Sequence, residues 1–346
     1  MLEIKNGRNQ RAVEDPNGKY PIYGSGGIMG YANDYICDAE TVIIGRKGNI
    51  NKPIFVEEPF WNVDTAFGLA AKRDLLLPKY LYYFCLRYDF EKHNKTVTIP
   101  SLTKADLLNI NIDLPSIEVQ QSTIDTLQKI EEVLNLRQQE LSALDDLIKA
   151  RFVEMFGDPV LNQKSFPVYR MDEVVDFQGG SQPDKKYFEY ESTPDNIRLI
   201  QIRDYKTDNY ITYIPKSMAK RFCTAEDIMI GRYGPPIFQI LQGIAGSFNV
   251  ALMKAIPKMG NREFVRYFLK QDCLLHYLEG MSKRTAGQDG IQMDKLKEYP
   301  FPLPPLELQE EFAEFVKQID KSKSVIQKSL DETQLLFDSL MQKYFG

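Results

Sequence analysis

Basic, aromatic and amide side chains lie beside glycines at several places in the sequence. Arginine and lysine reach phosphates or guanine edges, glutamine and asparagine read adenine, and glycine lets a backbone come close to a duplex. These residue types predict nucleic-acid contact. The candidate contact residues are Lys19, Tyr20, Tyr23, Arg46, Lys47, Ser181, Gln182, Lys185, Lys186, Arg232, Tyr233, Lys283 and Arg284.

One such cluster alone is more often ordinary protein surface. The interpretation rests on recurrence, because Arg46 follows a buried apolar run in the first half of the chain and Arg232 follows a similar run in the second. These two arginines are the strongest candidates for DNA contact. The alternative for either is a buried structural role, paired with carboxylates of its own lobe.

Motifs for catalysis are missing from the sequence. The glycine-rich string at 24–30 has no following Gly-Lys-Ser/Thr, which favours a turn over a phosphate loop. Neither His93 nor His276 lies near a Cys or acidic pair at metal-ligand spacing. No Gly-x-Ser-x-Gly or HExxH string occurs, and GPPI at 234–237 lacks both ends of an amino-methyltransferase motif. The sequence predicts no catalytic and no metal-binding residues, and an intrinsic nuclease stays as a remote alternative.

The chain contains an internal repeat. LPSIEVQQ at 114–121 returns as LPPLELQE at 303–310, an offset of 189 residues, and TVIIGRKG at 41–48 returns as DIMIGRYG at 227–234, an offset of 186. Two more pairs are RFVEMFG (151–157) with LMQKYFG (340–346), and PKYLYYF (78–84) with REFVRYF (262–268). The slowly changing offset indicates a collinear duplication with small insertions.

A long helix is predicted after each hinge, because residues 117–157 lack proline and have glycine only at the end. Apolar residues recur there at spacings of three and four, which is typical of a coiled coil. Antiparallel packing of the two helices would relate the lobes by a pseudo-twofold axis; the alternative is that each helix folds back on its own lobe. The predicted seam residues are Leu127, Ile130, Leu134, Leu141, Leu144, Ile148, Val316, Ile319, Ile326, Leu330, Phe337 and Leu340.

The predicted fold class is α/β (α+β), with two duplicated mixed lobes and two long helices packed as an antiparallel coiled coil. Short buried strands are expected to end at Gly45 and Gly231, with a glycine-punctuated turn region at 20–34 and amphipathic helices at 78–93 and 261–281. The predicted domains are a first lobe at 1–116, a first helix at 117–157, a second lobe at 158–303 and a second helix at 304–346.

The net charge of −5 is unevenly distributed. The two helical stretches sum to −7 and the rest of the chain to +2, so the overall acidity neither supports nor excludes nucleic acid as a partner. The four cysteines are far apart, which favours buried thiols of a cytoplasmic protein over disulfides. No apolar run has the length of a membrane span.

The chain resembles the specificity subunit of type I restriction-modification systems over essentially its whole length. The resemblance rests on YPIYGSGGIMGYA, the two strand-Gly-Arg-x-Gly strings, NVDTAF (62–67), and residues 99–121 with their counterpart at 290–310. The family's motif usually ends in Pro-Pro-x-x-Glu-Gln. Here LPSIEVQQ and LPPLELQE keep one glutamine each but not the adjacent Glu-Gln pair.

The resemblance implies that each lobe is a target-recognition domain reading one half of a split double-stranded DNA site. The helices would be conserved spacers that dock two methyltransferase subunits, which would bind S-adenosylmethionine and methylate adenine, and motor-nuclease subunits would join them. This chain would hold no cofactor and would not itself be an enzyme. A coiled-coil protein-interaction scaffold without sequence-specific DNA binding is the alternative.

The first lobe departs from the second at its start. Setting Gly7 against Gly179 leaves no counterpart in the first lobe for residues of about 166–172, so its opening strand is expected to be truncated or absent.

Overall fold

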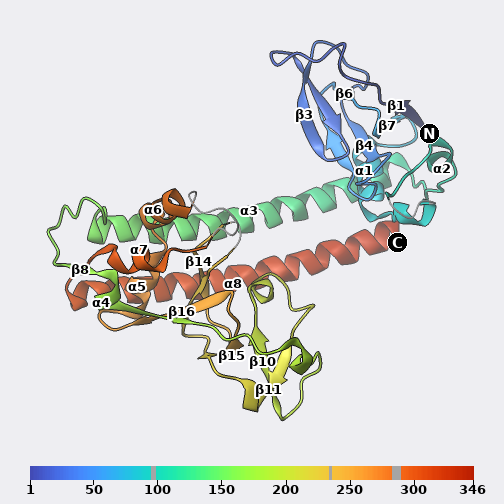
Figure 1. Cartoon of the computed structure of the whole chain (residues 1–346). Helices are drawn as coiled ribbons and strands as arrows, with labels where there is room; N and C mark the ends of the chain where they lie inside the picture. Colours follow the sequence, from blue (N-terminus) through green and yellow to red (C-terminus); the bar gives the residue numbers. More distant parts are fainter. Residues whose placement is uncertain (95–98, 234–235, 283–289) are drawn as a thin grey trace. The chain divides into compact units, whose positions relative to one another are not determined.

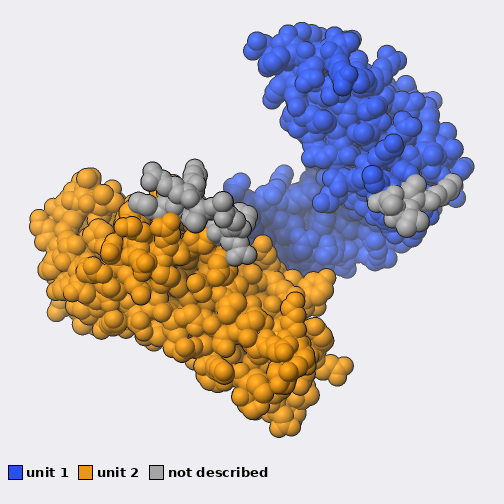
Figure 2. All heavy atoms as spheres, in the orientation of Figure 1, with its two compact units in different colours: residues 1–141, 325–346 blue, residues 142–324 orange. Residues whose placement is uncertain are grey.

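The structure, a computed structural model, describes residues 1–94, 99–233, 236–282 and 290–346 (Figure 1). It divides into unit 1, residues 1–141 with 325–346, and unit 2, residues 142–324 (Figure 2). Each unit therefore holds one lobe together with parts of both long helices. Among the described residues, no helix is long and apolar enough to cross a membrane.

The described residues of unit 1 form two small sheets and two short α-helices. The four-stranded sheet has the order β1 (Leu2–Asn6), β7 (Ala66–Ala71), β4 (Thr41–Gly45), β5 (Ile54–Val56), and the three-stranded sheet has the order β3 (Gly27–Ala32), β2 (Tyr20–Gly24), β6 (Trp61–Asn62). The helices are α1 (Pro78–Arg87), α2 (Lys104–Leu108) and a 3-10 turn, η1 (Phe90–His93). The predicted glycine-rich turn region is thus a hairpin of β2 and β3.

In unit 2 the residues that the structure describes form three sheets. The first sheet has the order β14 (Gln239–Gln242), β13 (Ile228–Gly231), β16 (Leu252–Pro257), β9 (Val175–Gly179). The second has the order β11 (Tyr213–Pro215), β10 (Asn196–Ile200), β15 (Gly246–Phe248), β12 (Phe222–Cys223). The third is the pair of β17 (Pro300–Pro302) and β8 (Val168–Arg170). The helices are α4 (Met171–Val174), α5 (Arg262–Leu269), α6 (Asp272–Ser282) and α7 (Met293–Glu298), with 3-10 turns η2 (Lys185–Tyr187), η3 (Ile202–Tyr205) and η4 (Lys216–Met218).

One sheet topology occurs in both units. The order β1-β7-β4-β5 in unit 1 matches β9-β16-β13-β14 in unit 2, and all neighbouring strands in both are antiparallel. The inner strands β4 and β13 are fully buried, as their unbroken apolar runs predict. The predicted duplication and the mixed α/β fold are therefore confirmed.

The two lobes align through Gly7 and Gly180. A Cβ atom would lie 1.8 Å from the Val63 carbonyl oxygen at Gly7 and 1.9 Å from the Asn249 carbonyl oxygen at Gly180. Only glycine allows such a close approach of two backbones. The predicted alignment of Gly7 with Gly179 is therefore wrong by one residue, because this approach, and not the glycine doublet in the sequence, defines the equivalent position.

Local signals explain where the shorter helices begin and end. Helix α1 starts with a proline in its first turn, and the side chain of Asn261 caps α5 by accepting from the N–H groups of Glu263 and Phe264. The stretch 261–281, expected to be one helix, breaks after Leu269 into α5 and α6. Similarly, α1 ends at Arg87 and only a 3-10 turn follows.

The two long helices are α3 (Ile117–Phe156) and α8 (Leu306–Phe345), within one residue of the predicted ends for α3. Every predicted seam residue is buried or half-buried. Within unit 2, Asp145 pairs with Lys323 at 2.6 Å, and Arg151 pairs with Glu311 at 2.8 Å. The later residue on α3 pairs with the earlier residue on α8, so the two helix segments run antiparallel in this unit.

A buried glutamine near the start of each long helix connects that helix to its lobe. Gln120 accepts from the N–H of Leu77, just before α1, at 2.9 Å. Gln309 accepts from the N–H of Asn261, just before α5, at 2.7 Å. Both side chains are almost completely buried. Gln120 also donates to the carbonyl oxygens of Leu75 and Pro115, and Gln309 donates to that of Pro304. These are the glutamines that the two hinge motifs share.

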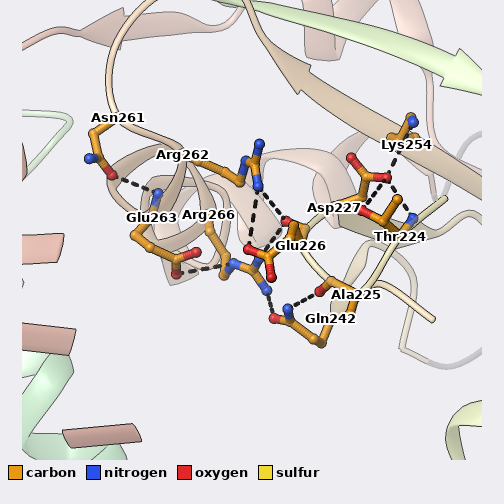
Figure 3. A network of polar contacts seen from close by, with 10 residues as sticks. All are labelled: Thr224, Ala225, Glu226, Asp227, Gln242, Lys254, Asn261, Arg262, Glu263 and Arg266. Atoms are coloured by element: carbon orange, nitrogen blue, oxygen red, sulfur yellow. Dashed lines mark hydrogen bonds and ion pairs between the residues drawn. The ribbon is translucent and has the colours of Figure 1, made fainter. Parts of the chain in front are cut away.

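In unit 2 a polar network attaches α5 to the β13–β14 hairpin (Figure 3). The buried guanidinium of Arg266 lies 3.2 Å from the Glu263 carboxylate and donates to the side-chain oxygen of Gln242 and to the Glu226 carbonyl oxygen. Next to it, the carboxylate of Asp227 pairs with Lys254 at 3.3 Å and caps a turn. The free-energy cost of burying the Arg266 guanidinium is therefore offset by a nearby carboxylate and two hydrogen-bond acceptors.

Candidate nucleic-acid interface

Equivalent backbone bonds hold the arginine-bearing loops that follow β4 and β13. The N–H of Arg46 donates to the carbonyl of Thr65 at 2.8 Å, and the N–H of Arg232 donates to that of Ala251 at 2.9 Å. One residue further on, Lys47 forms an isolated β-bridge with Ser101, and Tyr233 forms one with Gly290. The two loops therefore present their side chains from matching places in the fold.

The guanidinium of each arginine lies near an aromatic ring. The Arg46 Cζ atom lies 5.9 Å from the ring centre of Phe67, and that of Arg232 lies 5.3 Å from the ring centre of Tyr233. Arg46 is exposed and Arg232 is half-buried. In the part of the chain that the structure describes, neither forms an ion pair with a carboxylate. The Arg232 guanidinium donates one N–H to the Val250 carbonyl oxygen, at 3.5 Å. Its other N–H groups, and those of Arg46, are suited to phosphate or base oxygens.

In unit 2 a second candidate segment follows the close approach at Gly180. The N–H of Ser181 donates to the Phe248 carbonyl at 3.0 Å, and Gln182 is exposed. Lys185 is exposed, and Lys186 lies 3.5 Å from the Asp184 carboxylate and 5.0 Å from the ring centre of Tyr187. Lys186 therefore already has an anionic neighbour within its own turn.

Arg8 in unit 1 is the structural equivalent of Ser181 in unit 2. The sequence motifs did not predict it as a contact residue. The N–H of Arg8 donates to the Asn62 carbonyl at 2.8 Å, which reproduces the bond from Ser181 to Phe248, and its side chain is exposed. Aligning Gly7 with Gly180 is the signal that identifies this arginine.

The hairpin residues of unit 1 divide into a surface and a core group. Lys19 is exposed, with Nζ 5.4 Å from the ring centre of Tyr20, which packs against Tyr35 at 4.9 Å. The ring of Tyr23 meets Phe60 edge-on at 5.4 Å, and burial raises the pKa of Tyr23. Tyr23 therefore packs mainly as part of the lobe. The remaining candidates, Lys283 and Arg284, lie outside the described residues.

No group of three or more His, Cys, Asp or Glu side chains in the described residues has the geometry to hold a metal ion. All four cysteines are free, and Cys37, Cys85 and Cys223 are buried, as predicted. His93 forms a 2.6 Å hydrogen bond with the Tyr88 hydroxyl.

The family model of the type I restriction modification DNA specificity domain matches residues 1–145 and 163–333. The chain therefore belongs to the specificity subunits of type I restriction-modification systems, whose function is DNA sequence recognition. This assignment does not favour the alternative of a scaffold without sequence-specific DNA binding.

Similar proteins agree with this assignment. The type I restriction enzyme MjaVIII specificity subunit of Methanocaldococcus jannaschii is 22% identical over 340 residues, covering 85% of this chain and 73% of that protein. The type I restriction-modification S subunit of M. genitalium superposes with a TM-score of 0.59 at 17% identity, covering 100% of this chain and 94% of the other. A chain from a study of type I assembly and conformational transition gives a TM-score of 0.55 at 16% identity, with coverages of 99% and 97%. At these identities the solved structures show the common fold.

Proposed function

We propose that each unit reads one half of a split double-stranded DNA site, and that Arg46 and Arg232 are equivalent contacts to the two halves. The observation that carries this proposal is the repetition of one exposed or half-exposed arginine loop, fixed by equivalent bonds to Thr65 and Ala251. Two copies of one reading surface suit a target in two parts. Arg8, Lys47 and Lys185 would add phosphate contacts around them.

In the same proposal α3 and α8 form the antiparallel coiled coil that sets the distance between the half-sites. The antiparallel ion pairs of unit 2 support this packing, as does the full or partial burial of the predicted seam residues, and a pseudo-twofold axis would follow from it. The helices would dock two methyltransferase subunits, which would bind S-adenosylmethionine and methylate adenine in the cytoplasm. Motor-nuclease subunits would complete a restriction complex, and this chain would contribute no bond-making group.

Co-expression with the methyltransferase subunit, followed by mapping of methylated adenine in the host DNA, tests the proposal. We expect a split motif with one methylated adenine in each half. Arg46→Ala should relax or abolish reading of one half, and Arg232→Ala should do the same to the other half. If the arginine contacts a base, the free energy of discrimination against the wrong base should fall by about 1–3 kcal/mol.

The matched control is Arg73→Ala. Arg73 is an exposed arginine of unit 1 whose guanidinium pairs with Glu40, the residue just before β4, so it belongs to the opposite end of that strand from Arg46. This variant should leave the methylation motif unchanged. Equal losses in both halves from either arginine variant would contradict the assignment of one unit to each half-site.

A further inference from the structure

A hairpin of the second sheet is equivalent in the two units. In unit 1, β2 pairs parallel with β6 and antiparallel with β3, and in unit 2, β10 pairs parallel with β15 and antiparallel with β11. The carbonyl of Tyr23 accepts from the N–H of Val63 at 3.0 Å. The carbonyl of Ile200 accepts from the N–H of Asn249 at the same distance, 3.0 Å. The connection from β2 to β3 therefore corresponds to the connection from β10 to β11.

Both connections pack against the strand that carries the arginine loop of their unit. A Cβ atom at Gly45, the last residue of β4, would lie 3.1 Å from the Cβ atom of Ser25. A Cβ atom at Gly231, the last residue of β13, would lie 3.0 Å from the Cδ1 atom of Ile202. Each connection thus begins beside the glycine that directly precedes the candidate arginine.

The two connections differ in length and in their side chains. In unit 1 the strand registers leave residues 25–29, Ser-Gly-Gly-Ile-Met, which include no charged or aromatic side chain. In unit 2 they leave residues 202–211, which include the 3-10 turn η3 and Arg203. These two segments are the unit 1 tip and the unit 2 tip. Only the unit 2 tip can offer an arginine to a ligand.

Buried polar contacts hold the unit 2 tip in place. The carboxylate of Asp204 is buried, accepts from the N–H of Gln201 at 3.1 Å and lies 3.6 Å from the Nε atom of Arg198. Arg198 in turn pairs with Asp208 at 2.7 Å. Both carboxylates of the tip therefore have a cationic neighbour in the lobe, and the tip is organised before any ligand binds.

The side chain of Arg203 lines an open pocket among exposed aromatic rings. The pocket has a volume of roughly 380 Å³ and is also lined by Tyr190, Tyr210 and Tyr213. Tyr190 is 73% exposed and Tyr210 is 64% exposed. The Nη2 atom of Arg203 donates to the Thr212 hydroxyl at 2.9 Å, while its Nη1 atom makes no hydrogen bond among the described residues. A guanidinium fixed on one side and open on the other is suited to reading a base edge.

We propose that the unit 2 tip is a second reading element, in which Arg203 donates to a guanine edge in the half-site that Arg232 contacts. This inference rests on the function proposed above, because it adds a specificity-determining residue to the same interface. Guanine O6 and N7 are the commonest specific partners of arginine in the major groove. The unit 1 tip has no cationic side chain and would make no such contact, so the two units would read their halves with different sets of side chains.

Methylation mapping with the co-expressed methyltransferase subunit tests this proposal, because it reports each base of the motif separately. In Arg203→Ala the preference for guanine at one position should fall roughly tenfold or more, within the half that Arg232→Ala also relaxes. The other half should stay unchanged. Replacing the unit 2 tip by the unit 1 tip should relax the same position.

The matched control is Arg262→Ala. The side chain of Arg262 is 49% exposed, close to the 46% of Arg203. Its guanidinium lies 3.7 Å from the carboxylate of Glu226, which precedes β13, so it belongs to the opposite end of that strand from Arg232. This variant should leave the motif unchanged.

A second variant separates reading from folding, since Arg203 also bonds Thr212. Thr212→Val removes the hydroxyl but keeps the guanidinium, and Asp204 still holds the tip, so the guanine preference should remain. Equal relaxation by Thr212→Val and Arg203→Ala would overturn the proposal. So would a uniform loss of methylation at all sites in Arg203→Ala, which is the mark of a phosphate contact. An unchanged motif in Arg203→Ala beside a relaxed half in Arg232→Ala would overturn this proposal alone, and no change in either variant would overturn the proposed function as well.

Discussion

The two units differ in how the long helices meet the lobes. In unit 2, Phe152, Phe156, Phe264 and Phe312 form a cluster in which ring centres lie 4.8–5.7 Å apart. In unit 1 the equivalent positions are Met341, Phe345, Tyr80 and Thr123, of which only Tyr80 and Phe345 form a ring pair, at 4.9 Å.

A similar exchange occurs where α1 and α5 meet their hairpins. The charged network of Glu263, Arg266 and Gln242 in unit 2 is replaced by Lys79, Tyr82 and Phe55 in unit 1. There the rings of Phe55 and Tyr82 lie 5.5 Å apart, with the Lys79 ammonium over both. One topology thus accepts aromatic or ionic contacts at the same sites, provided that each buried polar group keeps its partners.

The largest difference between the units should appear at Phe312. Its ring is completely buried, so Phe312→Ala should lower the free energy of unfolding of unit 2 by about 3–5 kcal/mol, from lost burial and the cavity left behind. The counterpart Thr123→Ala removes far less volume and should cost about 1 kcal/mol. Denaturant-dependent hydrogen exchange, followed separately in the two units, measures both. Equal losses would show that the aromatic cluster does not stabilise unit 2 more than its counterpart stabilises unit 1.

The second difference should be one of salt sensitivity. Arg266→Ala leaves Gln242 and Glu263 without their buried partner and should cost about 2–3 kcal/mol, less than a fully buried pair because Glu263 is partly exposed. A double-mutant cycle of Arg266 with Glu263 should give a coupling energy that shrinks in 1 M salt. The matched cycle of Tyr82 with Phe55 should be almost unaffected by salt. Similar salt dependence in the two cycles would contradict an ionic role for Arg266.

Local sequence signals were sufficient for part of this structure. The inner strands β4 and β13 and the helices α3 and α8 were predictable, because an unbroken apolar run and a proline-free heptad pattern act over neighbouring residues. The parallel pairing of β10 with β15 and the equivalence of Gly7 with Gly180 were not, since both depend on contacts between segments far apart in the chain. Arg8 was missed as a candidate because its place in the fold follows from the equivalence of Gly7 with Gly180.

The smallest expected effect tests a feature that the two units share. Gln120→Leu and Gln309→Leu each leave buried backbone groups without a partner, so each should destabilise its own unit by about 1–2 kcal/mol. Gln120 donates to two carbonyls, of Leu75 and Pro115, whereas Gln309 donates to one, so the loss in unit 1 should be slightly larger.

The control is Gln121→Leu, which removes an exposed amide beside Gln120 and should change stability by less than about 0.5 kcal/mol. Exchange at the starts of α1 and α5 is the measurement, because each glutamine accepts from the N–H just before one of these helices. If exchange accelerates there only in the unit carrying the substitution, the retained glutamine of each hinge motif serves to fix the lobe to its own long helix. Acceleration in neither unit would leave that motif without the structural role assigned to it.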